Sequence, residues 1–370
     1  MGKWKTCTIA DIGTVVGGAT PSTKKPENYE NGTIPWITPK DLAGFTGRFI
    51  SRGERNITEI GLKSCSTQLL PRNSVLFSSR APIGYVAIAD NEVCTNQGFK
   101  SVVPYENTDY MFLYYLLKFN KDKIENMGSG TTFKEVSGNT MRGIGVTIPT
   151  DIEEQRRIAS VLSSLDEKKE LNEKINKNLA QQAQSIYADI FITNADPAWP
   201  LGHLSDLITV RYGKDHKKLD DGPFPVYGSG GVMRYVERPI YEKESVLIPR
   251  KGTLNNVIYV NEPFWSVDTM FFTEMKFPDV AKFIFHFVKS KDLASLNAGS
   301  AVPSMTTDIL NAMELYIPDA KVLRRFESTV GSMYETMRNN TEESKKLAAV
   351  RDSLLPRLMS GELDVSELDL

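Results

Sequence analysis

Two copies of one unit make up most of this sequence, and that repeat limits the folds that the chain can adopt. The passage IPTDIEEQRRIASVL, which begins at Ile148, has a counterpart, IPDAKVLRRFESTV, which begins at Ile317. From residue 152 onward the two copies align at a constant offset of 168. Earlier matches lie further apart, as between Trp4 and Trp199, at an offset of 195.

The offset changes only within the first part of each copy. Loops tolerate insertions and deletions, whereas packed helices do not. Each copy is therefore predicted to be a globular part with variable loops, followed by a helical part of fixed length. The largest change lies between Asp41 and Ser74, where the first copy is expanded.

The globular parts have the pattern of mixed α and β structure. Short runs rich in apolar and β-branched residues, such as SVLFSS from Ser74 and SVLIPR from Ser245, are separated by Gly, Pro and Asn. Each part also contains one clear helical run, over residues 108–127 in the first copy and 279–296 in the second.

The helical parts carry apolar residues at alternating spacings of four and three, which is the pattern of a coiled-coil seam. The middle of each seam is polar, at Asn172 and Asn176 in the first copy and at Asn340 and Ser344 in the second. Polar seam residues lower stability but fix the register of the helices. The apolar seam positions are Ile158, Leu162, Leu165, Leu179, Ile186, Phe326, Val330, Met333, Leu347 and Leu354.

These patterns predict an α+β fold with an internal pseudo-two-fold repeat. Two similar mixed α/β domains would be separated by two long antiparallel helices, an arrangement that brings the polar middles of the seams together. The predicted segments are a first domain at 1–149, a first helix at 150–191, a second domain at 192–318, and a second helix with the C-terminal tail at 319–370.

Composition places the chain among soluble globular proteins, because 41% of its residues are hydrophobic and 24% are charged. It contains no apolar run long enough to span a membrane and no signal-peptide pattern at residue 1, and its three cysteines form no CxxC pair. We therefore expect a cytoplasmic protein. The net charge is −2, but residues 1–149 hold 17 basic against 13 acidic residues, so any DNA-binding surface must be local.

The sequence contains none of the short motifs that mark a catalytic or metal site. His203, His216 and His286 have no metal-ligand spacing, either among themselves or with the cysteines. Neither a GxSxG nucleophile elbow nor a GxxxxGK[ST] phosphate loop is present. No catalytic residue and no bound metal are predicted.

Several passages, taken together, resemble the specificity subunits of type I restriction–modification systems. IPTDIEEQRRIASVL is similar to the family's junction between recognition domain and conserved helix, and SLLPRLMSGEL, from Ser353, is similar to its C-terminal signature. The passage from Ile57 to Ile88, followed by NQGF, resembles one type of target recognition domain. FPVYGSGGVMRY, from Phe224, resembles another.

The resemblance implies a non-catalytic subunit that binds double-stranded DNA. Each globular part would be a target recognition domain for one half of a split, asymmetric site, and the helices would set the spacer between the halves. The partners would be two modification (methyltransferase) subunits and, through them, the restriction subunits. S-adenosylmethionine, ATP and Mg would belong to those partners, and this chain would bind no cofactor.

Within such domains, side chains that can pair with base edges or phosphates are the candidates for DNA contact. In the first domain they are Lys40, Arg48, Arg52, Ser78, Ser79, Arg80, Asn96 and Gln97. In the second domain they are Arg211, Lys214, Tyr227, Gly228, Ser229, Gly230, Gly231, Arg250 and Lys251. The SSR and PRK clusters, at Ser78 and Pro249, occupy matching positions of the repeat.

Two arginine pairs recur at matching positions of the helical parts, Arg156–Arg157 and Arg324–Arg325. They are either a solvated face, paired within the helix to Glu153 and Glu154, or contacts to the modification subunits or DNA phosphates.

Two alternatives to a DNA-recognition subunit remain open at this stage. One is a DNA methyltransferase fused to its own recognition domain, which the absence of a cofactor motif disfavours. The other is a structural coiled-coil adaptor that does not bind DNA.

Overall fold

The computed structural model describes residues 3–130, 134–296 and 304–365, which fall into two units. Unit 1 comprises residues 1–174 and 340–370, and unit 2 comprises residues 175–339. Each unit therefore contains one globular part and parts of both long helices. None of the helices in these described ranges is long and apolar enough to cross a membrane.

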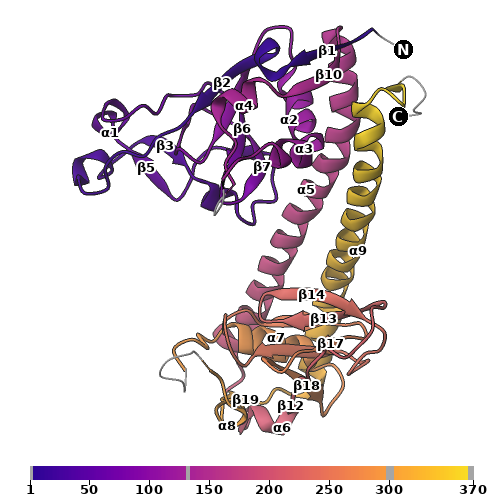
Figure 1. The fold of residues 1–370 in the computed structure, drawn as a ribbon. Coiled ribbons are helices and arrows are strands. Elements are labelled where there is room, and N and C mark those ends of the chain that lie inside the picture. The colour runs from indigo at the N-terminus through magenta and orange to yellow at the C-terminus, as the bar shows by residue number, and fades with distance from the viewer. Residues whose placement is uncertain (1–2, 131–133, 297–303, 366–370) are drawn as a thin grey trace. The chain divides into compact units, whose positions relative to one another are not determined.

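The globular part of unit 1 is built around a five-stranded sheet in the order β2-β9-β6-β7-β4. Figure 1 labels β2, β6 and β7 of this sheet. A three-stranded sheet, β5-β3-β8, and a two-stranded sheet, β1-β10, complete the globular part. The strands are β1 (Trp4–Thr8), β2 (Gly13–Gly17), β3 (Ile34–Ile37), β4 (Phe49–Ile50), β5 (Arg55–Ile57), β6 (Val75–Ser79), β7 (Ile83–Ala89), β8 (Cys94–Thr95), β9 (Lys100–Pro104) and β10 (Gly145–Pro149). The helices are α1 (Glu59–Lys63), α2 (Tyr110–Phe119), α3 (Lys121–Asn126) and α4 (Gly138–Arg142).

The globular part of unit 2 repeats this plan with fewer elements. Its sheets have the orders β12-β18-β15-β16, β14-β13-β17 and β11-β19. The strands are β11 (Leu201–His203), β12 (Ile208–Tyr212), β13 (Phe224–Gly228), β14 (Gly231–Val236), β15 (Ser245–Pro249), β16 (Ile258–Val260), β17 (Trp265–Ser266), β18 (Met270–Met275) and β19 (Glu314–Tyr316). The helices are α6 (Leu204–Leu207), α7 (Ala281–Lys289) and α8 (Thr307–Asn311).

Strand register confirms that the two globular parts are copies of one fold. Gly13 of β2 pairs with Pro104 of β9, and Ile208 of β12 pairs with Met275 of β18, at the offsets predicted from sequence. One parallel pair is repeated as well, as β3 with β8 in unit 1 and as β13 with β17 in unit 2. The expanded segment of the first copy holds β4, β5 and α1.

A pair of tryptophans supports the same relation in a less obvious way. Trp36 on β3 and Trp265 on β17 lie on different strands of the repeated parallel pair. Even so, each indole Nε1–H donates to the carbonyl at the same repeat position, Ala19 O at 3.1 Å and Lys214 O at 2.9 Å. The two copies therefore carry the tryptophan on non-equivalent strands, but its indole donates to the equivalent carbonyl in both.

The two long helices are α5 (Ile152–Ala188), which continues as a π turn at Asp189–Thr193, and α9 (Ala320–Met359). They run antiparallel inside each unit. In unit 1, Asp166 pairs with Arg351, while Asn172 donates to the carbonyl of Asn340 at 3.4 Å. Residues further along α5 therefore contact residues earlier in α9, as in an antiparallel pair. In unit 2, Asn176 donates to the carbonyl of Met337 at 3.1 Å, so the polar seam residues do face the opposite helix.

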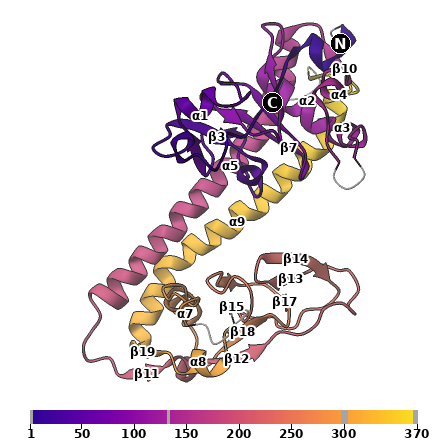
Figure 2. The ribbon, with the colours of Figure 1, turned by 60° about the vertical axis from the view of Figure 1, so that its left-hand side comes forward.

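Every predicted apolar seam residue lies in a buried or half-buried position. Ile158, Leu162, Phe326 and Val330 are buried, and the half-buried positions are Leu165, Leu179, Ile186, Met333, Leu347 and Leu354. The hydrophobic core of each unit joins its helix parts to its globular part. In unit 2, for example, α7 lies beside the long helices (Figure 2). There Phe283 of α7 packs on Tyr187 of α5, with ring centroids 5.9 Å apart.

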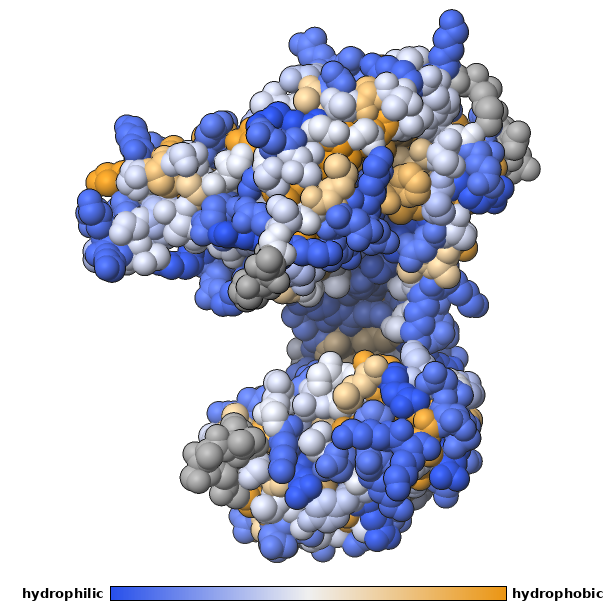
Figure 3. All heavy atoms as spheres, viewed as in Figure 1, coloured by the Kyte–Doolittle hydropathy of each residue, from blue (hydrophilic) through white to orange (hydrophobic). Residues whose placement is uncertain are grey.

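The division into units differs from the predicted domain boundaries in one respect. The sequence separates globular parts from helices near residues 149, 191 and 318, whereas packing divides both helices near their middles. The cause is that each half-helix buries its apolar residues against a globular part. On the face drawn in Figure 3, hydrophilic side chains cover most of the surface, and hydrophobic atoms appear as small separate patches.

Candidate nucleic-acid interfaces

A cluster of loops at one end of the unit 1 strands collects most of the candidate DNA-contacting residues. Backbone hydrogen bonds tie these loops together: Ala19 N–H to Thr95 O at 3.1 Å, Asn96 N–H to Ile37 O at 3.0 Å, and Ser79 N–H to Gly98 O at 2.7 Å. We call this the first loop cluster, comprising residues 18–20, 38–41, 79–83, 96–100 and 134–136. Residues far apart in the sequence thereby form one surface.

Cations and amides of the first loop cluster lie close together. Arg80 and Lys100 both pair with Glu135, at 3.5 and 3.4 Å, and Gln97 is exposed and accepts a hydrogen bond from Thr20. Side-chain amides and guanidinium groups are the donors and acceptors that discriminate between base edges. Sequence reasoning did not identify Lys100 or Glu135.

Lys40 and Arg52 also carry exposed cations, Lys40 within the first loop cluster and Arg52 outside it. The side chain of Lys40 is 78% exposed, and its ammonium pairs with Glu54 at 2.7 Å. Arg52 is exposed in the expanded segment of the first copy. Asn96 is half-buried, and its side-chain oxygen accepts the Gly98 N–H at 2.9 Å, so its amide nitrogen is the part that can reach a ligand.

Ser78 and Ser79, in contrast, cannot contact a base in this geometry, and that prediction is corrected. Both are fully buried in β6. Ser78 Oγ donates to Pro82 O and accepts the Tyr85 N–H, each at 2.8 Å, so it closes the bulged turn between β6 and β7. A buried hydroxyl that is already paired has no free edge to offer to DNA.

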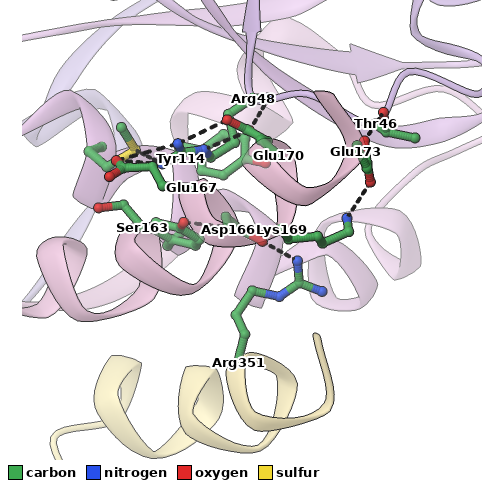
Figure 4. Close-up of polar contacts among 12 residues, drawn as sticks. Thr46, Arg48, Tyr114, Ser163, Asp166, Glu167, Lys169, Glu170, Glu173 and Arg351 are labelled. Carbon is green, nitrogen blue, oxygen red and sulfur yellow. Dashed lines mark hydrogen bonds and ion pairs between the residues drawn. The ribbon is translucent and has the colours of Figure 1, made fainter. Parts of the chain in front are cut away.

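The prediction that Arg48 contacts DNA is also corrected, because its side chain is buried against α5 rather than free at the surface. Its side chain is only 4% exposed and pairs with Glu170 of α5 at 2.9 Å and with Glu167 at 3.4 Å (Figure 4). Burial lowers the pKa of Arg48, but the hydrogen bond and charge of Glu170, with the nearby Glu167, together outweigh it and raise the pKa above its ordinary value. A buried, fully paired guanidinium holds the loop 45–48 on α5 and cannot serve as a phosphate contact.

Unit 2 has a second loop cluster, residues 213–216, 227–231, 249–253, 267–269 and 304–305, with the same backbone hydrogen bonds. Lys214 N–H bonds to Ser266 O at 2.8 Å, Val267 N–H to Tyr227 O at 3.1 Å, and Arg250 N–H to Thr269 O at 2.8 Å. Each of these bonds sits at the repeat position of a bond in the first loop cluster. The frame is therefore conserved between the two copies, while the side chains on it differ.

In the second loop cluster, the half-buried Arg250 lies beside the aromatic ring at the end of β12. The guanidinium of Arg250 lies 5.4 Å from the ring centre of Tyr212 and donates to Asp268 O at 3.2 Å. Lys251 and Lys214 are exposed, and Arg211 pairs with Glu274 at 3.0 Å. Sequence reasoning did not identify Tyr212, which ends β12 and is half exposed.

The glycine-rich loop of unit 2, from Tyr227 to Gly231, is the turn of the β13–β14 hairpin. Tyr227 donates to Glu262 at 3.0 Å, and burial raises the pKa of its hydroxyl. Gly231 has a φ of 108°, which L side chains rarely adopt, and Ser229 O accepts from Asn256 at 2.7 Å. Gly228 is buried, whereas Gly230 is exposed at the tip.

Two glycines at matching positions are required by close backbone approach. A Cβ on Gly18 would lie 2.2 Å from the Thr95 and Asn96 carbonyl oxygens, and one on Gly213 would lie 2.0 Å from the Val267 carbonyl oxygen. No side chain fits at those distances. The loops that carry Thr20 and Lys214 are thus held against the β8 and β17 strands in both units.

The arginine pairs on the helices differ between the copies. Arg156 and Arg157 pair with Glu153 and Glu154 one turn away, each at 2.5 Å, as expected for an intrahelical pairing. Arg324 and Arg325 are exposed, and within the described part of the chain neither has a carboxylate at ion-pair distance.

No group of His, Cys, Asp and Glu able to hold a metal ion occurs among the described residues.

Comparisons with known proteins agree with these features. A model of the type I restriction modification DNA specificity domain matches residues 1–181 and again residues 198–332. The MjaIX specificity subunit of Methanocaldococcus jannaschii is 31% identical, over 99% of this chain and 94% of its own length. The EcoR124I/EcoR124II specificity subunit of Escherichia coli is 34% identical over 44% of this chain and 41% of its own. The S subunit of a type I system from M. genitalium has the same fold, with a TM-score of 0.62 at 18% identity, covering 97% of this chain and 96% of that one.

Proposed function

Because this chain belongs to the family of type I restriction–modification DNA specificity subunits, which are non-catalytic, we propose that it recognises a bipartite, asymmetric DNA site. The first loop cluster would contact one half of the site, and the second loop cluster would contact the other. The alternative of a methyltransferase fused to its recognition domain is not retained, since the family matches span the chain and its relatives are specificity subunits.

One observation carries this proposal: the same hydrogen-bonded loop frame occurs twice with different side chains. Asn96, Gln97, Arg80 and Lys40 occupy the first frame, whereas Arg250, Lys251, Lys214 and the 227–231 turn occupy the second. A repeated frame supports two equivalent binding tasks, and different side chains support two different base sequences. An adaptor without DNA contact would have no need for cationic loops at equivalent ends of both copies.

The long helices would set the number of base pairs between the two half-sites. With 37 residues in α5 and 40 in α9, each is about 55 to 60 Å long at 1.5 Å per residue. That length corresponds to about 16 to 18 base pairs at 3.4 Å each. Helices of this size can therefore separate two recognition surfaces by a fixed, unread spacer.

The helices would also dock two modification subunits, which recruit the restriction subunits. The exposed Arg324 and Arg325 are candidate contacts for these partners, together with Arg156 and Arg157. S-adenosylmethionine, ATP and Mg would be bound by the partners. Since the DNA that such a complex modifies is the host chromosome, we expect the chain to act in the cytoplasm.

The test is methylation of a genome. The chain would be co-expressed with its modification subunit in a host without DNA methylation of its own, and methylated positions would be mapped. We expect methylated bases within a single two-part motif with a constant spacer. Methylation without any such motif, or none despite a purified complex, would contradict the proposal.

The spacer role has a separate test. One heptad inserted after Asn172 in α5 and one before Asn340 in α9 keeps the seam register and lengthens the pair by about 10 Å. The mapped spacer should then grow by about three base pairs. An unchanged spacer would contradict the role of the helices while leaving DNA recognition intact.

A further inference from the structure

A single carboxylate serves two cations in the first loop cluster. Glu135 Oε2 lies 3.5 Å from the Arg80 guanidinium, and Glu135 Oε1 lies 3.4 Å from the Lys100 ammonium. Within the described residues, no other carboxylate lies at ion-pair distance from either cation. Glu135 therefore neutralises one of two positive charges and touches both.

The contacts of Glu135 are loose enough to be exchanged. Charge-assisted hydrogen bonds in proteins are usually about 2.7 to 2.9 Å long, so these pairs are longer than tight ones. The side chains of Glu135 and Arg80 are 40% and 35% exposed. Partly exposed pairs of this kind contribute little to stability, so a competing anion can replace the carboxylate at small cost.

Lys100 is placed to receive such an anion. Its side chain is 15% exposed, and among the described residues its ammonium approaches, besides Glu135, the neutral groups Ser79 Oγ at 3.4 Å and Gln97 O at 3.5 Å. Lys100 begins β9 beside the amides of Asn96 and Gln97. A phosphate that reached Lys100 would therefore place neighbouring bases near these amides.

The second loop cluster lacks this carboxylate. Lys251 stands at the repeat position of Arg80, and the residue paired with it across an isolated bridge is Ser304, at the repeat position of Glu135. The position of Lys100 is taken by Phe271, which is buried. The two copies share the backbone frame but differ in whether a carboxylate competes for the cations.

We propose that Glu135 is a specificity-determining residue of unit 1, which withholds Arg80 and Lys100 from DNA phosphates until a matching half-site displaces it. The proposal rests on the DNA recognition proposed above. On a non-matching duplex, phosphates must compete with Glu135 without the help of base contacts, so the two cations stay occupied. On the matching half-site, base contacts hold the backbone in place and a phosphate takes the position of the carboxylate.

The experiment measures binding of the complex of this chain with its modification subunit to two duplexes, one with the mapped site and one without, over a range of KCl concentrations. The variant Glu135→Gln keeps the shape of the side chain and removes its charge. We expect tighter binding of the non-matching duplex, a salt dependence steeper by about 0.9 for each cation released, and a smaller ratio of specific to non-specific affinity. Glu92→Gln is the control, because it makes the same charge change at an exposed residue outside the loop cluster.

A double-substitution cycle separates this role from a general charge effect. In the wild type, Lys100→Met should change non-specific affinity little, since Glu135 occupies the ammonium. In the Glu135→Gln background the same change should remove most of the gained affinity. Two results would overturn the proposal, provided that the wild type still binds its site. One is an equal change in non-specific affinity on Lys100→Met in both backgrounds. The other is a salt dependence of binding that Glu135→Gln leaves unchanged. Loss of site-specific binding by the wild type itself would instead contradict the DNA recognition on which the proposal rests.

Discussion

Asp166 is the residue whose replacement most directly tests how unit 1 is held together. It is 5% exposed on α5, where it accepts a hydrogen bond from the Tyr115 hydroxyl of α2 at 2.8 Å. Its other oxygen pairs with Arg351 of α9 at 2.5 Å, so one carboxylate connects three helices (Figure 4). Tyr115 is fully buried, and burial and the neighbouring Asp166 raise the pKa of its hydroxyl.

Replacing Asp166 with alanine leaves two buried groups without their acceptor. An unpaired buried hydroxyl costs about 1 to 3 kcal/mol, and breaking a buried ion pair costs about 3 to 5 kcal/mol. The two costs share one partner and do not add. Arg351 also pairs with Asp352 at 2.7 Å and is 14% exposed, so the loss of its pair with Asp166 contributes less to the free-energy cost. We therefore expect a loss of about 3 kcal/mol for unit 1.

Peptide-resolved hydrogen exchange is the suitable assay, because a chain with two units does not unfold in one two-state step. A loss of about 3 kcal/mol corresponds to exchange roughly 100-fold faster in α2 and in the parts of α5 and α9 that belong to unit 1. Peptides of α7 should not change. The control is Tyr334→Phe, which removes the hydrogen bond to His286 at 2.9 Å in unit 2 and should affect α7 alone. A change in α2 of less than tenfold would refute the reasoning.

Three further predictions concern other parts of the fold. Burial, followed by the charge of Lys289, lowers the pKa of His286 to about 4, whereas the unfolded value is near 6.5. The unfolded chain thus takes up the proton first, so unit 2 should lose up to about 3 kcal/mol as pH falls from about 6.5 to about 4, and acid titration of His286→Phe should lack this slope. Gly213→Ala should lower the stability of unit 2 by about 1 to 3 kcal/mol, measured by denaturant titration, and an unchanged midpoint would show that the loop can move aside. Asn172→Ala should cost about 1 kcal/mol in unit 1, seen as faster exchange in residues 340–344, because it removes the hydrogen bonds from this buried amide to Glu343 and to the Asn340 carbonyl.

Much of the fold could be predicted because the chain is a repeat. The offsets between the copies place loops where the length changes. The matching passages that begin at Trp4 and Trp199 contain the matching strands β1 and β11, and those that begin at Ser74 and Ser245 contain β6 and β15. The heptad pattern located both long helices within a few residues of their ends. The division of the helices between two units could not be predicted, since it depends on tertiary packing such as that of Tyr115 on Asp166.

The candidate interfaces were only partly predictable. Cationic turns such as SSR and PRK mark the loops, but the local pattern does not say which side chains of a strand point inward, so the buried Ser78 and Ser79 were included. Arg48 was misplaced because its partner Glu170 is 122 residues away in the sequence. Lys100 and Glu135 were missed for the same reason, since only the folded strands bring them together.

An exchange of residues 1–149 for the equivalent segment of a relative with a different mapped site tests the central claim most directly. The hybrid chain would be co-expressed with the modification subunit, and its methylated positions would be mapped across the genome. If each loop cluster recognises one half-site, one half of the motif changes while the other half and the spacer stay the same. A motif that changes in both halves, or that does not change at all in a folded and active complex, would contradict recognition by two independent units.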